Sequence, residues 1–570
     1  MEAQLQQSAI RLIDGVPFAR IANIDFQQFI QLPAEPSMAD FFETLTWQLT
    51  NILLNDELED DISAGVPPQL RNKYIHRIKK DRLSRLWEGI LHERHAKYVD
   101  KIQNLEERAV VLLSCHRIEE ACKTLVEGGN PHLATLVAQI GRDQTIRIDM
   151  QNQVESWRQH NVYSEMSEPI RALYELLAGN ALRSEGKPSG ALEDRASTFL
   201  MSERFDLDWF QAFGLRLWYS IADDEPIEDA VFRFHHDLIH ENEPAFPTPW
   251  RVESHGNPNG TSDVSKLESA LWIVLKLYAM ITSNKAVDAG LSKIEFPATL
   301  LPTAVSGNPL KHRPTFQLHQ VITTIVGPHD SLIVDSARAD QLVWDYCAEL
   351  IAADQLEKSV FVALHLSRAI DRERLIKEIL ASFASKLPNQ LNTNGDTNAL
   401  WLYLTNTLQL PEVWIWVAKA LHARAIGDSV NEVYYLIRGK NWNEAHSTFC
   451  RTVGPRMIIQ RDHGTLQRLV AGFGDSPERK VRGWTSGAGM YDDFLQLVQM
   501  KGARLDHGRL KKLVLALVEM GKKINRTSNT EALEERVALM EMSGIVSGWC
   551  LNDETNVRRL VGPAIMRHRS

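Results

Sequence analysis

The sequence predicts an all-α protein built as an irregular α-solenoid, in which short helices stack one on the next. Two observations predict this fold. Short amphipathic helices follow one another from residue 107 to residue 179, each with one apolar stripe and each closed by a turn signal. No repeat of fixed length runs through the 570 residues, which argues against a regular tetratricopeptide or HEAT array.

The first two helices show the template most clearly. The stripe of the first consists of Ile118, Ala121, Cys122 and Leu125. Gly128 and Gly129 then end this helix, Asn130 suits an N-cap, and Pro131 suits a first helical position. The stripe of the second consists of Leu133, Leu136, Val137 and Ile140. Each stripe needs a neighbour to cover it, so we expect these helices to stack.

The template recurs along the chain. A third helix opens at Pro169 and ends before Gly179, and further copies follow Pro411 as far as Gly439. Between the helical segments, residues 243–266, 296–314 and 386–398 are rich in Pro, Gly, Asn and Ser and have no apolar period. We interpret these stretches as module boundaries, and the first as a long mobile connection.

Composition restricts the partners and the compartment. With 44% hydrophobic residues the chain can bury a large core, and its net charge of -10 argues against nucleic acid as a partner. The N-terminus lacks the apolar run of a signal peptide, and the most apolar stretch, from Leu271 to Ile281, is too short to cross a bilayer. The five cysteines form no C-x-x-C pair, which indicates a reducing compartment such as the nucleus or cytoplasm.

Motifs for chemistry are not found. The sequence has no phosphate-binding loop and no dinucleotide fingerprint, and Ala96 stands where a zinc-protease helix beginning at His92 needs its second histidine. We therefore predict no catalytic, cofactor-binding or metal-binding residues, and no enzyme.

Three groups of residues have spacings that also occur in metal or catalytic sites. His236 and His240 have the spacing of a metal-binding pair, although a solvated helix end explains them. His446 and Cys450 share a helix face, as an activated cysteine would, but His446 also lies in an apolar stripe. The acidic residues 223–225 precede Pro226 and favour a helix N-terminus.

The run from Arg71 to Trp87 is the one dense positive cluster. One reading is a helix with Tyr74, Ile78 and Leu86 facing inward and its cations, including Lys79, Lys80, Arg82 and Arg85, in water. The other is a patch that binds an importin or an acidic partner. Neither reading suggests catalysis.

Several segments, taken in order, also carry a family resemblance. They are FFETLTWQL (41–49), RLSRLWEGIL (82–91), the Ala121-Cys122 step, HLATLVAQIG (132–141), RALYELLAG (171–179), the run 207–231, WNEAHSTFC (442–450) and VGPRMII (453–459). This order resembles the scaffold nucleoporins of the ancestral coatomer element class. Within that class it is most similar to the propeller-binding member of the Y-shaped coat of the nuclear pore, the C-terminal product of a self-cleaving precursor.

The resemblance implies an α-solenoid folded back on itself. Residues 1–100 would form the outbound trunk, 101–242 the crown, 243–398 the returning trunk and 399–570 the tail. The crown would dock on the neighbouring arm nucleoporin, the trunk would carry a WD40-propeller coat protein, and the tail would meet two hub nucleoporins.

Function then follows as assembly of the nuclear pore complex at the nuclear envelope, in support of nucleocytoplasmic transport, without nucleic acid and without direct membrane insertion. The residues expected to contact the arm nucleoporin are the crown stripes, represented by Ile118, Leu125, Leu133, Val137 and Ile140. The tail residues that contact partners are left unassigned.

One departure and two alternatives complete these expectations. Family members insert a three-stranded blade into the open propeller, but no alternating strands or hairpin turns are expected before Phe41, so weaker propeller binding is predicted. An outer-coat protein of secretory vesicles has the same fold, although the propeller and proline-rich region expected of it are missing here. A helical enzyme with a Cys-His or metal site is the third possibility.

Overall fold

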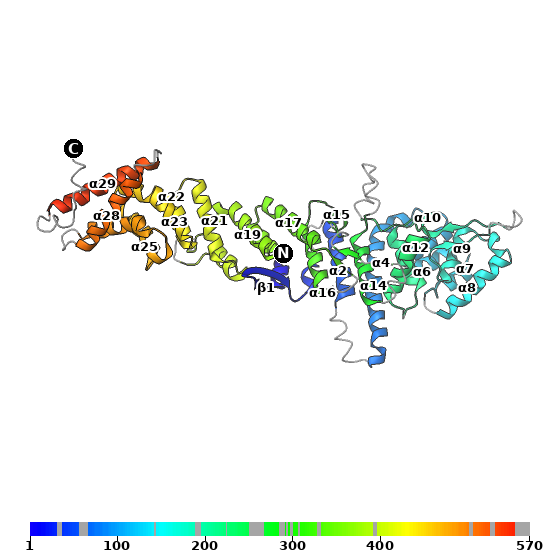
Figure 1. Cartoon of the computed structure of the whole chain (residues 1–570). Helices are drawn as coiled ribbons and strands as arrows, with labels where there is room; N and C mark the ends of the chain where they lie inside the picture. The colour runs from blue at the N-terminus through cyan, green and yellow to red at the C-terminus, as the bar shows by residue number, and fades with distance from the viewer. Residues whose placement is uncertain are drawn as a thin grey trace. The chain divides into compact units, whose positions relative to one another are not determined.

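The computed structural model describes residues 1–30, 37–55, 67–141, 144–187, 195–223, 225–249, 267–283, 291, 294–296, 300–305, 308–327, 332–391, 396–500, 506–524 and 531–552. It divides into two compact units. Unit 1 comprises residues 1–9 and 20–349, and unit 2 comprises residues 10–19 and 350–570. Helices dominate both units, which confirms the all-α prediction (Figure 1). The four-part division into trunk, crown and tail stays a prediction.

Unit 1 contains most of the predicted stacked helices. Its first helices are α1 (Glu2–Gln6), α2 (Met38–Leu54), α4 (Pro68–Val99), α5 (Leu105–Ser114), α6 (Ile118–Glu127), α7 (Pro131–Val137), α8 (Gln144–Gln159) and α9 (Glu168–Leu177). The stripe helices thus begin and end close to the residues that the turn signals predict. A short 3-10 helix, η1 (Phe26–Gln28), precedes α2, and another, η2 (Val162–Glu165), follows α8.

The second half of unit 1 contains further helices and two short strand pairs. Its elements are β3 (Arg183–Ser184), β4 (Phe199–Leu200), α10 (Met201–Arg204), α11 (Trp209–Leu215), η4 (Arg216–Ser220), α12 (Ile227–His240), α14 (Ala270–Thr282), β5 (Ile294–Phe296), α15 (Pro302–Val305), α16 (Arg313–Val326), β6 (Leu332–Val334) and α17 (Ser336–Ala352), whose last turn passes into unit 2. β3 pairs antiparallel with β4, and β5 pairs parallel with β6.

The helices of unit 1 close into a circuit. α2 packs on α4, α4 on α11, α11 on α12, α12 on α14, and α14 returns to α2. Buried aromatic rings fill its centre: the ring centroid of Phe213 lies 5.1 Å from that of Trp87 and 6.0 Å from that of Trp272. The chain therefore folds back on itself, as the fold prediction states.

Unit 2 is a run of helices in which most contact the next along the chain. Its elements are α18 (Leu356–Ala363), α19 (Ala369–Ser382), η7 (Ala384–Lys386), α20 (Ala399–Leu402), η8 (Tyr403–Thr407), α21 (Glu412–Ala425), α22 (Ser429–Arg438), α23 (Trp442–Thr448), η9 (Phe449–Val453), α24 (Gly454–Gln460), α25 (His463–Gly472), α26 (Pro477–Lys480), η10 (Trp484–Ser486), α27 (Ala488–Gln499), α28 (His507–Ile524) and α29 (Glu531–Asn552). η8 and η9 are single π-helical turns. In Figure 1, α21 and α22 lie side by side, and α28 and α29 also pack together.

A β-hairpin precedes the first long helix, and here the sequence prediction is wrong. β1 (Ser8–Ile13) and β2 (Val16–Ile21) form a two-stranded sheet, although no strands were expected before Phe41. Asp14-Gly15 is the sequence signal that predicts this hairpin turn. Both residues adopt positive φ, 53° and 76°, as a two-residue hairpin turn requires. Its apolar side chains alternate only weakly, so a period-2 search misses it.

Part of this hairpin is held inside unit 2. The Ala19 N–H donates to the Leu364 carbonyl at the end of α18 (3.1 Å). Arg372 of α19 is fully buried and donates to the carbonyls of Pro17 (3.1 Å) and Leu366 (2.7 Å). Its guanidinium lies over the Phe18 ring, 4.8 Å from the centroid. One side chain thus joins β2 to the α18–α19 corner.

The described helices include none that is long and apolar enough to span a bilayer.

Arg372→Ala is expected to lower the free energy of unfolding of unit 2 by about 2–4 kcal/mol, because it leaves buried carbonyls of Pro17 and Leu366 without their donor. Urea unfolding would measure the loss, and hydrogen exchange should rise at residues 16–21. Arg374→Ala is the matched control, since Arg374 makes only an exposed pair with Glu378 on the same helix. Equal free energies of unfolding for the two variants would contradict a stabilising role for the Arg372 hydrogen bonds.

Candidate protein-protein interface

Helices α6 and α7 and the turn after α7 bury most of the side chains that the sequence assigned to a partner. Leu125, Leu133, Val137 and Ile140 are buried in the core of unit 1, and Ile118 is half-buried against it. α5 packs on α6, α6 on α7, and both α5 and α7 on α9, so the chain covers these stripes itself. A buried side chain cannot contact a partner in the folded protein. Leu125, Leu133, Val137 and Ile140 are therefore unsuited to the interface, and the half-buried Ile118 stays a prediction.

Other side chains on the same helices face solvent. The large apolar residues exposed on α6, α8 and α12 and in η2 are Val126, Ile148, Ile239 and Val162. Val126 directly follows the buried Leu125, and at 100° per residue it points to a different side of α6. Sequence periodicity finds such residues only as interruptions of a polar face, and it gives them no role.

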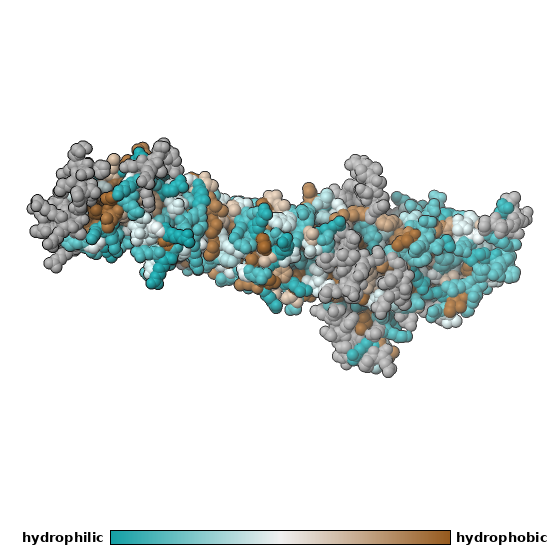
Figure 2. All heavy atoms as spheres, in the orientation of Figure 1, coloured by the Kyte–Doolittle hydropathy of each residue, from teal (hydrophilic) through white to brown (hydrophobic). Residues whose placement is uncertain are grey.

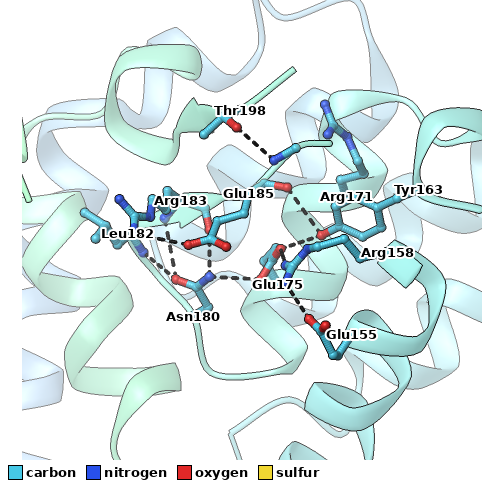
Figure 3. Close-up of polar contacts among 12 residues, drawn as sticks. Glu155, Arg158, Tyr163, Arg171, Glu175, Asn180, Leu182, Arg183, Glu185 and Thr198 are labelled. Carbon is cyan, nitrogen blue, oxygen red and sulfur yellow. Dashed lines mark hydrogen bonds and ion pairs between the residues drawn. The ribbon is translucent and has the colours of Figure 1, made fainter. Parts of the chain in front are cut away.

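A buried polar network supports this part of unit 1. The carboxylate of Glu175 on α9 accepts hydrogen bonds from the Tyr163 hydroxyl and from Asn180 Nδ2 (2.9 Å), and it also contacts Arg158 on α8 (3.4 Å) (Figure 3). Asn180 Nδ2 donates as well to the carbonyl of Arg183 at the start of β3 (2.6 Å). Burial, followed by the nearby Glu175 charge, raises the pKa of Tyr163, which keeps this phenol a hydrogen-bond donor.

Arg171 extends the network to the second strand. Its guanidinium donates to the Ser197 carbonyl (2.9 Å) and lies 5.1 Å from the centroid of the Phe199 ring in β4. Figure 3 shows Arg171 and Glu175 pointing from α9 toward the residues around β3. These contacts join α8 and α9 to β3 and β4, so we interpret the network as structural support for this part of unit 1.

Two lysines of the basic helix α4 are buried, although the sequence analysis placed them in water. Lys79 and Lys80 are both buried. Lys79 Nζ donates to the carbonyl of Leu53 at the end of α2 (3.3 Å), and Lys80 Nζ donates to that of Ala222 (2.8 Å). Burial lowers the pKa of Lys80, against the attraction of Asp223. These lysines donate to backbone carbonyls at the end of α2 and after η4, whereas Arg82 and Arg85 are exposed as predicted.

His446 and Cys450 do meet, at the edge of an open pocket of about 900 Å³ in unit 2. The Cys450 thiol lies 3.5 Å from His446 Nε2, which also accepts the backbone N–H of Ala488 (3.0 Å). Burial raises the pKa of Cys450 to about 12 and lowers the pKa of His446. Both groups are therefore neutral near pH 7, and no thiolate-imidazolium nucleophile forms.

The other candidate site residues from the sequence do not converge on one site. The rings of His236 and His240 lie 4.8 Å apart at an exposed helix end, with Asp237 beside His236. Asp223 pairs with Lys80 (3.6 Å), Glu225 accepts the N–H of Ala222 (2.8 Å), and residue 224 lies outside the described residues. Within the described part of the chain no three His, Cys, Asp or Glu residues form a group suited to a metal ion.

Glu175→Ala is expected to destabilise unit 1 by roughly 3 kcal/mol, because it leaves Tyr163 and Asn180 without their buried acceptor. Glu155→Ala is the matched control, since Glu155 contacts the same Arg158 (2.7 Å) from an exposed position and should change stability by less than about 0.5 kcal/mol. Thermal or urea unfolding compares the two. Similar losses in both variants would contradict the role of burial.

Cys450 is expected to resist alkylation in the folded chain at pH 8, because with a pKa of about 12 the thiol is almost wholly protonated. Iodoacetamide labelling followed by mass spectrometry should show slow modification that accelerates only when urea unfolds the protein. Fast native labelling that His446→Ala abolishes would instead revive the catalytic interpretation.

Comparison with known proteins now places the chain. The family model described as Nuclear protein 96 matches residues 107–422, more than half of the chain. Nucleoporin NUP145 of Chaetomium thermophilum is 31% identical over 82% of this chain, and nucleoporin nup189 of Schizosaccharomyces pombe is 27% identical over 90%. Nuclear pore complex protein NUP96 of Arabidopsis thaliana is 25% identical over 69%.

The matches cover only a part of each relative. The chain spans 21%, 27% and 34% of the lengths of these three proteins, in the same order. All three are named as nucleoporins or nuclear pore complex proteins and none as an enzyme, which also favours the nuclear pore over the vesicle coat. The chain therefore belongs to the Nuclear protein 96 family and is a nucleoporin of the nuclear pore complex.

Proposed function

We propose that this chain is a structural scaffold of the Y-shaped coat of the nuclear pore, in which it links arm, hub and propeller subunits through helix-helix interfaces. The observation that carries the proposal is that the family match coincides with a closed helical circuit in unit 1 and a helical run in unit 2. In both, the polar clusters of the described residues serve packing. By holding the coat together, the chain would support transport of protein and mRNA through the pore.

The crown (residues 101–242) would dock on the neighbouring arm nucleoporin through its exposed faces. Because the predicted stripe residues are buried, we propose Val126 on α6 and Ile148 on α8 as contact residues in their place. An exposed apolar side chain gains free energy when a partner removes it from water, so these two residues suit a contact. The network around Glu175 would hold these helices in the orientation that the partner recognises.

The trunk helices would carry the WD40-propeller coat protein. Weaker propeller binding stays part of the proposal, because β1 and β2 are two strands where the family's blade has three, and β2 is already bound to Leu364 and Arg372. The tail (residues 399–570) would meet two hub nucleoporins. We propose no nucleic acid partner and no direct membrane insertion, in line with the acidic net charge and the helices described above.

Val126→Asp and Ile148→Asp, made separately, are expected to weaken the complex with the crown-bearing arm nucleoporin of the same organism by at least tenfold. Each puts a charge into an apolar contact without disturbing the core. Size exclusion with light scattering would give the complex mass, and melting should stay within a few degrees of wild type.

Ile370→Asp is the control for this experiment, since Ile370 is an equally large exposed apolar residue in unit 2. It should leave the crown complex intact. A wild-type chain that forms no complex would remove the arm contact from the proposal, whereas a complex that tolerates both crown variants would move the contact to other crown residues.

A further inference from the structure

Two short motifs in the sequence have the pattern that proline-directed protein kinases recognise. Among the 23 prolines, only Pro249 and Pro477 directly follow a serine or threonine. An arginine stands two residues after each of these prolines, in Thr248-Pro249-Trp250-Arg251 and in Ser476-Pro477-Glu478-Arg479. Lys and Arg are 63 of the 570 residues, so an arginine after both steps is uncommon by chance. Both motifs are therefore candidate phosphorylation sites.

The pattern has a physical basis in the kinase. A proline after the acceptor hydroxyl presents a ring and no backbone N–H, so it suits a kinase pocket that offers no hydrogen-bond acceptor at this position. An arginine three residues after the acceptor can pair with an anionic group at the edge of the active site. Both motifs supply these two features. They differ in whether a kinase can reach them in the folded protein.

The Thr248 motif is held against unit 1. Pro247 and Pro249, on either side of Thr248, are buried, and Thr248 itself is half-buried. The Pro247 carbonyl accepts the backbone N–H of Ser269 at the start of α14 (2.8 Å). A kinase needs access to the hydroxyl and to the proline ring together, so the fold protects this motif.

The Ser476 motif lies on the surface of unit 2, in the turn between α25 and η10. Residues 474–476 and 478–480 are all exposed, and Pro477 is half-buried. The Ser476 side chain makes no capping hydrogen bond at the start of α26. Figure 2 shows hydrophilic surface over α25, the helix that leads into this turn. The acceptor hydroxyl and the arginine thus both face solvent.

The backbone at Ser476 favours opening of the turn. Its φ of 56° and ψ of 53° place a non-glycine residue in the left-handed region, which is uncommon. A residue that precedes proline prefers an extended conformation, and a kinase active site binds its substrate segment extended. Release of this strain offsets part of the cost of opening. Only the single helical turn of α26 is lost in the process.

A lysine beside the turn is placed to respond to a phosphate. Lys480 Nζ donates to the Phe473 carbonyl (3.1 Å) and lies 4.9 Å from the centroid of the Trp442 ring on α23. The same Nζ lies 3.1 Å from a Cβ built on Gly474, two residues before Ser476. A phosphoserine carries about two negative charges and pairs with such cations. It would therefore compete with Phe473 and Trp442 for Lys480.

We propose that Ser476 is a phosphorylation site for a proline-directed protein kinase, and that the fold protects Thr248 from the same enzyme. The Ser476 oxygen bonds to the γ-phosphorus of ATP as the bond from that phosphorus to the β-γ bridging oxygen breaks. ADP leaves, and the hydroxyl proton passes to a carboxylate base of the kinase. The new phosphate draws Lys480 from Trp442 and loosens the turn on α23. This inference does not depend on the proposed function.

Incubation of the full chain with a cyclin-dependent kinase and ATP, followed by mass spectrometry, tests the site. A single phosphate is expected on Ser476 and none on Thr248. Ser476→Ala should abolish the modification, and Pro477→Ala should slow it by about tenfold or more. Thr248→Ala is the matched control and should leave the rate unchanged. Ser476→Ala should melt as wild type does, because this exposed side chain makes no capping hydrogen bond.

Peptides of residues 242–256 and 470–484 show whether each motif is itself a substrate. Both should be phosphorylated, because neither has a fold to protect it. A folded chain that stays unmodified at Ser476 while its peptide reacts would overturn the inference, and so would a Ser476 peptide that the kinase rejects. Equal modification of Thr248 and Ser476 in the folded chain would overturn the protective role of the fold.

Hydrogen exchange measures what the phosphate does. Exchange should rise over residues 473–480 of the phosphorylated chain, because Lys480 leaves the Phe473 carbonyl and the Trp442 ring. Lys480→Ala should cause the same rise without phosphate, since it removes the same contacts. Lys511→Ala is the matched control, because Lys511 is an exposed lysine on α28. Unchanged exchange in the phosphorylated chain would overturn the release of Lys480.

Discussion

The aromatic cluster of Trp87, Phe213, Phe234 and Trp272 is the contact on which unit 1 depends. These four buried rings come from α4, α11, α12 and α14, and the outer two of the set are 185 residues apart in the sequence. Trp87 Nε1 also donates to the Phe210 carbonyl (2.8 Å). This hydrogen bond fixes the orientation of α4 against α11, while the rings supply the buried apolar surface. An α-solenoid without such a join would extend indefinitely, because each helix needs only its neighbours. Here the returning helix α14 packs on α2 at the start of the circuit, and a stack of short helices becomes a closed body.

The sequence predicts much of this fold because local signals determine helices. Gly128, Pro131 and Pro169 mark ends and starts that the structure reproduces to within about two residues. What the stripes cannot show is which neighbour covers them. Leu125 and Val137 have the pattern of a contact surface, yet the chain's own helices cover them. Local sequence is equally unable to place Lys79 and Lys80. A lysine that donates to a backbone carbonyl of another segment has the same neighbours in the sequence as a lysine in water.

The hairpin of β1 and β2 was missed for a different reason. Strands are stabilised by pairing and by the surface beneath them, and here that surface is the α18–α19 corner with Arg372, more than 350 residues away. Only the Asp14-Gly15 turn was visible locally. His446 and Cys450 illustrate the opposite case, in which a local pattern is real but burial removes its chemistry. Their spacing brings the two groups within 3.5 Å, while the desolvation that accompanies this contact keeps both uncharged.

These cases suggest how a scaffold can be recognised when its helices carry no chemical motif. A stripe that the chain covers contributes stability, and a stripe that stays open can contribute assembly, so the two are distinguished by burial and not by sequence. In unit 1 the closed circuit covers nearly every stripe of the described helices, and partners are left with isolated residues such as Val126. In unit 2 the last helices also close on themselves, since α29 returns to α24 after α25, α27 and α28, but Leu533, Val537 and Met540 of α29 stay exposed. A helical protein can make an interface from the same interaction that holds its own helices together, because a helix of another subunit can bury an apolar side chain that the chain leaves exposed.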